Sequence, residues 1–153
     1  MQRRTFLGAA GALALVPAPA IASRPADEVA VKKFIIDWYV QFGNPRVDRT
    51  HYRSFMTDDY MLLENGALMN KEGDVGLLDG IPLDQKRSDT FDFRRVVVEG
   101  SRACLVYFLQ SEISDSKKGR RTNRYLESAL LRRERGKWRA FVLHSTKINP
   151  VTA

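Results

Sequence analysis

Thiols and imidazoles are scarce in this sequence, which has one cysteine and two histidines among its 153 residues. A single cysteine excludes an intramolecular disulfide, and the apolar run ACLVYFL around Cys104 predicts that its side chain is buried. So few thiols and imidazoles also argue against a structural zinc site. The sequence lacks a glycine-rich phosphate loop, a nucleophile elbow and metal-ligand spacing. We therefore expect neither a metal nor another cofactor.

Acidic residues are the minority among the charged residues, and the formal net charge is +7. The densest basic cluster surrounds Gly119 in the segment KKGRRTNR, which is typical of a solvated hairpin turn. Nucleic-acid binding favours basic residues gathered on one element with aromatic residues between them. Since this cluster has no such aromatic residues, we expect no nucleic-acid partner.

Long hydrophobic runs are also missing, because the apolar stretch from Phe6 to Val16 is too short for a confident membrane span. Arg3 and Arg4 precede it, and Ala20-Ile21-Ala22 follows as a cleavage pattern. The segment RRTFL resembles the twin-arginine export signal. Residues 1–22 are thus expected to be a signal peptide that engages the twin-arginine translocase and directs the protein to the periplasm. An ordinary Sec signal and an uncleaved amphipathic anchor are the alternatives.

The part of the sequence after the signal begins with helical patterns. Apolar residues recur at steps of three and four between Asp27, a candidate N-cap, and Gly43. A shorter helix is predicted after Asp48. A third is predicted from Asn70 to Gly80, and it should be weak because it contains two internal glycines.

Strand patterns make up most of the rest. Tyr60 to Leu63 reads as a short strand closed by the turn Asn65-Gly66. Four longer strands are predicted at residues 90–99, 102–113, 123–133 and 138–148. Their short connections favour antiparallel hairpins. The expected fold class is α+β, with three N-terminal helices packed on one face of a curved antiparallel sheet.

Four segments resemble the nuclear transport factor 2-like superfamily, and in particular its SnoaL-like branch. They are DWYVQF, DDYMLLENG, the asparagine-lysine start of the third helix, and YLESALLRRERGKWRAFVLHSTKI. The resemblance covers residues 27–148 and implies a cone-shaped sheet around a cavity, closed by the long helix. It also implies frequent dimerisation through the outer sheet face. Family members include ketosteroid isomerases, dehydratases, polyketide cyclases and ligand-binding modules, so the fold alone does not name a reaction.

The register of the last hairpin decides which side chains share the cavity. A two-residue turn at Arg135-Gly136 pairs Glu134 with Lys137 and sets Glu127 opposite His144, whereas a three-residue turn would separate them. In the first register one face carries Tyr125, Glu127, Trp138, Val142 and His144. The other face carries Leu126, Leu130, Arg139, Phe141 and Leu143, and its apolar side chains predict a homodimer.

Glu127 and His144 are the candidate catalytic pair, with the carboxylate orienting an imidazole that moves a proton. The same two residues could instead form a buried pair that closes the sheet. Candidate ligand-binding residues near the cavity are Trp38, Tyr39, Tyr60, Glu64, Tyr107 and Tyr125. The carboxylate base and tyrosine-centred oxyanion site of the ketosteroid isomerases cannot be placed on this sequence by matching motifs.

Three functions remain open from the sequence. The first is an exported module that binds an unknown small molecule. The second is an enzyme of the isomerase, dehydratase or cyclase type that uses the Glu127–His144 pair. The third is an interaction module that pairs with itself through the outer sheet face.

Overall fold

The computed structural model describes residues 25–148, so the expected signal peptide lies outside the described residues. Three α-helices, one 3-10 turn and six strands follow in order. They are α1 (Pro25–Gly43), α2 (Arg49–Arg53), β1 (Met56–Glu64), β2 (Ala67–Asn70), α3 (Lys71–Leu77), η1 (Leu78–Gly80), β3 (Lys86–Glu99), β4 (Arg102–Asp115), β5 (Gly119–Glu134) and β6 (Lys137–Lys147). The α+β class is confirmed. The third helix follows β1 and β2, so only α1 and α2 precede the sheet.

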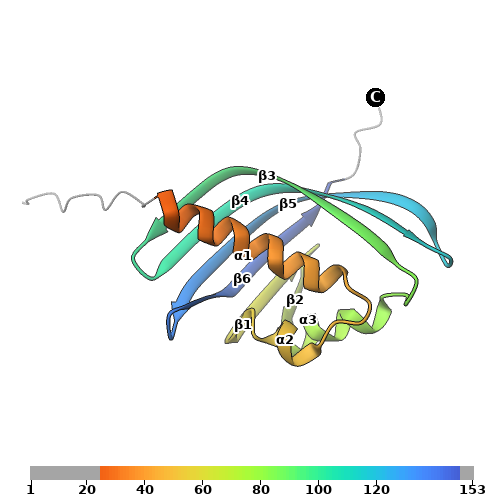
Figure 1. Cartoon of the computed structure of the whole chain (residues 1–153), viewed down its shortest axis with the longest axis horizontal. Helices are drawn as coiled ribbons and strands as arrows, with labels where there is room; N and C mark the ends of the chain where they lie inside the picture. Colours follow the sequence, from red (N-terminus) through yellow and green to blue (C-terminus); the bar gives the residue numbers. More distant parts are fainter. Residues whose placement is uncertain (1–24, 149–153) are drawn as a thin grey trace, which may run out of the picture.

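The six strands form one mixed sheet in the order β2-β1-β6-β5-β4-β3. Strands β3 to β6 are joined by antiparallel hairpins, as the sequence predicts. Strand β1, however, pairs with β6 in parallel, so the expectation of an antiparallel sheet is wrong at this one pairing. Parallel neighbours need a long crossover, and here the whole β2-to-β5 segment supplies it. Figure 1 shows the long strands bending around α1, with all three helices on the same face of the sheet.

Helix α1 packs on the sheet through side chains spaced by about one turn. Val31, Ile35, Trp38 and Tyr39 are buried, which matches the stripe that an amphipathic helix presents to a core. Trp38 lies in a group of rings, with its centroid 5.8 Å from Tyr60 and 6.4 Å from Tyr52. The long helix therefore contributes the centre of the hydrophobic core.

Local signals place the short elements. Asp48 caps α2 by accepting a hydrogen bond from the Thr50 backbone N–H, and Asn70 caps α3 through the Gly73 N–H. The β1–β2 turn has positive φ at both Asn65 and Gly66, as a two-residue hairpin requires. The two caps and this turn confirm the sequence predictions, whereas strand β2 was not predicted.

The last hairpin begins in the predicted register and then leaves it. Glu134 pairs with Lys137, and Leu131 pairs with Ala140. Leu130 then pairs with Val142, so Phe141 is an extra residue, a β-bulge. Beyond the bulge every residue of β6 is shifted by one. Glu127 therefore lies opposite Ser145 rather than His144, and the predicted Glu127–His144 pairing is wrong.

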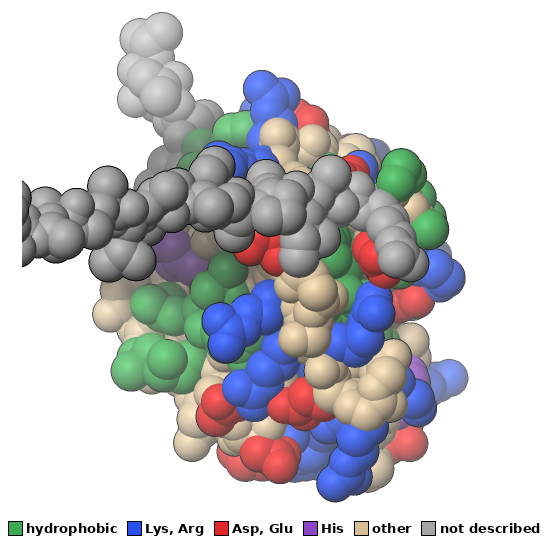
Figure 2. Space-filling model, turned by 90° about the vertical axis from the view of Figure 1, so that its left-hand side faces the viewer, with side chains coloured by type: hydrophobic (Ala, Val, Ile, Leu, Met, Phe, Trp, Pro, Cys, Tyr) green, Lys and Arg blue, Asp and Glu red, His purple; other side chains and the backbone are tan. Residues whose placement is uncertain are grey.

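The same shift changes which side chains face outward. Leu143 is 6% exposed and belongs to the core, so its predicted place on the outer face is wrong. The outer face keeps Leu126 and gains Phe108, Met61 and Leu63, which are between 37% and 42% exposed. In Figure 2, hydrophobic side chains gather at the left of the view, on the side of the sheet away from α1. Among residues 25–148 no helix packs on this face.

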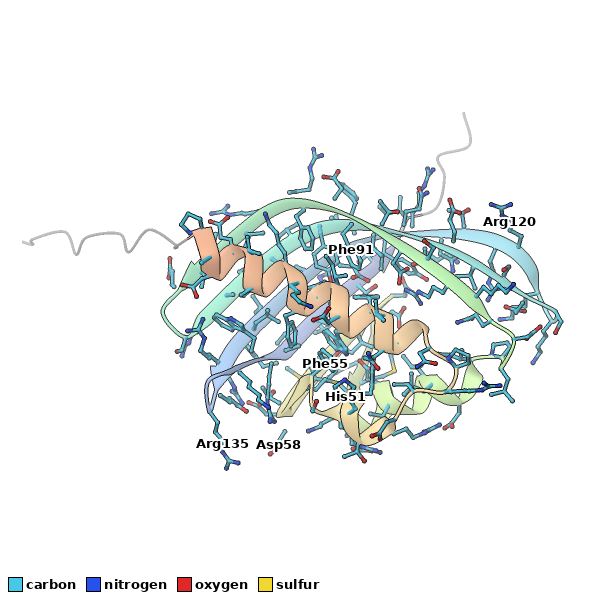
Figure 3. The ribbon with its side chains drawn as sticks, in the orientation of Figure 1. His51, Phe55, Asp58, Phe91, Arg120 and Arg135 are labelled. Carbon is cyan, nitrogen blue, oxygen red and sulfur yellow. The ribbon has the colours of Figure 1, made fainter. Side chains whose placement is uncertain are left out.

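The basic hairpin between β4 and β5 projects into solvent, as expected for the KKGRRTNR segment. Gly119 adopts a positive φ at the turn, and the Arg120 side chain is 84% exposed at the tip (Figure 3). Arg121 forms an ion pair with Asp115, whose carboxylate also accepts from the Lys118 backbone N–H. No helix within the described chain is long and apolar enough to cross a membrane.

Candidate functional site

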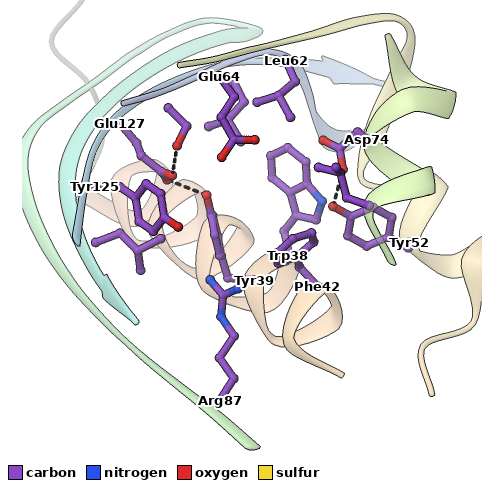
Figure 4. A pocket seen from close by; sticks show the side chains of 14 residues that line it. Trp38, Tyr39, Phe42, Tyr52, Leu62, Glu64, Asp74, Arg87, Tyr125 and Glu127 are labelled. Atoms are coloured by element: carbon purple, nitrogen blue, oxygen red, sulfur yellow. Dashed lines mark hydrogen bonds between the residues drawn. The ribbon is translucent and has the colours of Figure 1, made fainter. Parts of the chain in front are cut away.

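A pocket of about 250 Å³ lies between the inner face of the sheet and the three helices. Figure 4 shows its wall of aromatic rings and its acidic side chains. The residues that line it are Trp38, Tyr39, Phe42, Tyr52, Leu62, Glu64, Asp74, Leu77, Arg87, Leu109, Tyr125, Glu127, Leu143 and Ser145. Five of the predicted site residues are in this list: Trp38, Tyr39, Glu64, Tyr125 and Glu127.

Glu127 is the acid at one end of the pocket, and it is only 3% exposed. The Tyr39 hydroxyl donates to its Oε2 at 2.5 Å, and the Ser145 hydroxyl donates to its Oε1 at 2.8 Å. The Tyr107 hydroxyl lies beside the carboxyl without hydrogen-bonding geometry. Burial raises the pKa of Glu127, and the hydroxyl donors together with the positive charge of Arg87 partly oppose that rise.

Asp74 is a second buried acid in the same pocket, and sequence reasoning missed it. It is 2% exposed, and its two oxygens accept hydrogen bonds from Tyr52 and Tyr60, each at 2.7 Å. Burial raises the pKa of Asp74, while the two tyrosine hydroxyls lower it. A signal was present in the sequence, because Asp74 lies on α3 next to Val75 and four residues before Leu78, both of which are buried. An acid on an apolar helix face needs a partner in the interior.

Glu64 is the third acid, on β1, and its carboxylate points into the space between the other two (Figure 4). It is half-buried and makes no side-chain hydrogen bond or ion pair with any residue from 25 to 148. Burial and the negative charge of Asp74 raise the pKa of Glu64. Its side chain therefore carries unused acceptor capacity within the pocket.

Among the described residues that line the pocket, Arg87 on β3 is the one basic residue, and it too was not predicted. Its Nε lies 2.9 Å from the Asp89 carboxylate, and its Nη2 donates to the Ser111 hydroxyl. The guanidinium packs over the rings of Tyr39 and Phe42, at 5.6 and 5.1 Å from their centroids. Its charge is thus already paired outside the group of pocket acids.

The remaining predicted site residues lie elsewhere. His144 is exposed on the outer face of β6, and its ring Nε2 is 3.4 Å from the Thr146 hydroxyl. It does not reach Glu127, so the proposed acid–imidazole unit does not form. Tyr60 and Tyr107 are buried beside the pocket but do not line it.

Trp38 adds a polar group to the pocket wall. The residue is 2% exposed, and its indole Nε1 is buried without a hydrogen-bond partner in the described part of the chain. The Tyr52 hydroxyl is nearby but not in hydrogen-bonding geometry. A buried donor without an acceptor is unusual in folded proteins.

The site combines rings with acids rather than metal ligands. Among the described residues, no three His, Cys, Asp or Glu side chains converge as they would around a metal ion. The arrangement can enclose a small apolar body, accept hydrogen bonds through Glu64, and hold protons on two carboxyls whose pKa values are raised. Each buried carboxyl is fixed by two hydroxyls, so its position is set before any ligand arrives.

No protein-family model and no curated protein matches the sequence of this chain. Solved structures do match. A ketosteroid isomerase-like protein from Erwinia carotovora atroseptica is 18% identical, with a TM-score of 0.66 over 83% of this chain and 100% of that one. An NTF2-like protein with a cystatin-like fold from Novosphingobium aromaticivorans is 16% identical, with a TM-score of 0.66 over 83% and 85%.

A hexachlorocyclohexane dehydrochlorinase from Novosphingobium barchaimii is also similar. It is 14% identical, with a TM-score of 0.64 over 81% of this chain and 88% of that one. Identities this low establish the fold and leave the chemistry open. The chain has the nuclear transport factor 2-like, or cystatin-like, fold that these proteins share.

Proposed function

We propose that this protein binds a small, largely apolar molecule in the pocket between α1 and the sheet. The observation that carries the proposal is a pocket of about 250 Å³ walled by aromatic rings, with buried Glu127 and Asp74 each held by two hydroxyls. Ligand pockets are concave and mostly apolar with a few placed polar groups, and the lining of this pocket has that composition.

Export remains part of the proposal. The RRTFL motif with Arg3 and Arg4, and the cleavage pattern at Ala20 to Ala22, support passage through the twin-arginine translocase to the periplasm. The first described helix begins at Pro25, just after that pattern. We also propose that the sheet is cone-shaped and that the protein belongs to the SnoaL-like branch. The GKWRAFVLHST segment supports both.

Acid–base catalysis is the second candidate, with Glu127 alone in place of the Glu127–His144 pair. A buried carboxyl with a raised pKa keeps its proton closer to neutral pH, as a general acid must. The hexachlorocyclohexane dehydrochlorinase shows that this fold supports small-molecule chemistry in another chain. Turnover of a bound molecule that Glu127→Gln abolishes, with binding retained, would favour this candidate.

Self-association through the outer face of the sheet is a third part of the proposal. Phe108 and Leu126 are 40% and 42% exposed there, and Met61 and Leu63 continue the apolar surface along β1. Contiguous exposed apolar surface commonly marks a protein interface. We therefore retain the homodimer as a proposal, with Leu143 removed from its interface.

Native mass spectrometry of protein purified from the periplasm tests the binding proposal. We expect a retained small molecule in the unaltered protein and in Leu63→Phe. We expect none in Leu62→Phe, because Leu62 lines the pocket while the neighbouring Leu63 faces outward. Retention in both variants would place the molecule outside the pocket. Absence from all three proteins, with no small molecule able to change Trp38 fluorescence in a Trp138→Phe background, would refute binding.

A further inference from the structure

The charges that line the pocket are unbalanced. Among residues 25–148, three carboxyl groups line it, and the one basic side chain in the lining, Arg87, is engaged by Asp89 and Ser111. Asp74 and Glu127 have only hydroxyl partners, and Glu64 has no partner in residues 25–148. Buried or half-buried carboxylates are normally paired with a cation, since removing the charge from water is costly. The described chain does not provide that cation.

The walls of the pocket are suited to a cation as well. Rings of Trp38, Tyr39, Phe42, Tyr52 and Tyr125 line it, and the negative face of an aromatic ring attracts ammonium groups. Arg87 already makes this contact with two of these rings from one side. Aromatic walls with carboxylates between them favour an organic cation over an anion or a purely apolar molecule.

Trp38 gives the pocket a buried aromatic wall. The residue is only 2% exposed, and its indole N–H is buried without an acceptor among residues 25–148. Figure 4 shows the Trp38 ring beside the Glu64 and Asp74 side chains, where the apolar part of a ligand held by Glu64 would contact it.

We propose that the ligand is a small organic amine whose ammonium group is held by Glu64, between Asp74 and Glu127, while its apolar body lies on the ring of Trp38. This inference rests on the proposed function and adds the chemical class of the ligand. Glu64 is the primary contact because, of the three carboxylates, it alone accepts no hydrogen bond from residues 25–148. Asp74 and Glu127 add negative charge on either side when they are ionised.

Binding of such an amine depends on pH in a defined direction. Both acids nearest to Glu64 have raised pKa values, and so does Glu64 itself. The charged and titratable groups that face it are Asp74 on α3, Tyr39 on α1, Tyr52 on α2, Arg87 on β3, and Tyr125 and Glu127 on β5. Protonation of the acids removes the attraction, so amine affinity falls as the pH is lowered through the raised pKa values of these acids.

Isothermal titration of the full chain with matched probes tests the proposal. The probes are benzylamine and isoamylamine, with benzyl alcohol and isoamyl alcohol as neutral analogues of the same size. We expect each amine to bind at least about tenfold more tightly than its alcohol at neutral pH, as for a charge-assisted hydrogen bond in place of a neutral one. The preference should disappear in Glu64→Gln and persist in Glu112→Gln, because Glu112 is exposed on the outer face of β4.

The outcomes separate the two levels of the proposal. Equal or tighter binding of the alcohols overturns the amine assignment and leaves the binding function intact. An amine preference that Glu64→Gln does not reduce overturns the role of Glu64. If no probe binds while the protein retains another, uncharged molecule, the ligand class is wrong. If nothing is retained and no probe binds, the binding function fails together with the inference.

Discussion

Tyr39→Phe is the substitution that isolates the hydrogen bond at Glu127. The change deletes one hydroxyl and keeps the ring, whose edge packs on Phe91 with centroids 5.5 Å apart. The lost contact is the 2.5 Å bond to Glu127 Oε2, which is buried and cannot be replaced by bulk water. Hydrogen bonds to charged groups contribute about 1.5–3 kcal/mol, so we expect a loss of about 2 kcal/mol in unfolding free energy when Glu127 is ionised.

The size of this loss should depend on pH, and its sign follows from the pKa. Burial raises the folded-state pKa of Glu127, and the Tyr39 hydroxyl opposes that rise by stabilising the anion. Removing the hydroxyl raises the pKa further, so the folded state holds its proton to higher pH than the unfolded state does. Stability therefore falls more steeply with rising pH in Tyr39→Phe, starting near the ordinary glutamate pKa of 4.5.

Urea denaturation of both proteins at about pH 4 and about pH 8 measures the effect. Tyr125→Phe is the matched control, since Tyr125 lines the same pocket and its hydroxyl makes no hydrogen bond within residues 25–148. We expect a small, pH-independent change in the control. Equal losses for the two variants, or a loss for Tyr39→Phe that is the same at both pH values, would refute the reasoning that Tyr39 stabilises the Glu127 anion.

Three further predictions follow from burial and exposure. Trp38→Ala should reduce the unfolding free energy by about 3–5 kcal/mol in a urea titration, because it empties a fully buried site. Trp138 is only half-buried, so Trp138→Ala should reduce the unfolding free energy markedly less in the same measurement. His144→Ala should change the unfolding free energy by less than about 0.5 kcal/mol and leave ligand retention in native mass spectra unaltered. Loss of the ligand from this variant would show that His144 belongs to the site. We expect the unaltered protein to have the mass of a dimer by light scattering and the double variant Phe108→Glu, Leu126→Glu to have the mass of a monomer. A double variant that is still a dimer would show that the interface does not lie on this face.

Local chemistry made much of the fold predictable. The Asp48 and Asn70 caps and the Asn65-Gly66 turn each depend on residues within three positions of one another, and the structure has all of them. The antiparallel pairing of β3 to β6 follows from short connections in the same way. The parallel pairing of β1 with β6 joins segments about eighty residues apart, and no local pattern contains that information.

The site was only partly predictable for a related reason. Apolar spacing placed Trp38 on the buried side of the long helix, and the family resemblance placed Trp38 and Tyr39 at the cavity, where both line the pocket. Arg87 and Asp74 were missed, since charged residues in strands and helices are usually on solvated faces. Their burial depends on partners from distant elements, such as Tyr60 for Asp74 and Ser111 for Arg87.

One extra residue, Phe141, decides the chemistry of the site. With an uninterrupted ladder from the Arg135-Gly136 turn, alternation would bring Val142 and His144 to the inner face beside Glu127. The bulge exchanges them for Leu143 and Ser145, so the acid meets a hydroxyl that can only hydrogen-bond to it instead of an imidazole that could share its proton. A strand that bends around a helix needs such irregularities, because bulges increase local twist. The curvature that creates the pocket thus also removes the histidine from it, and Glu127 is left to act with the hydroxyls of Tyr39 and Ser145.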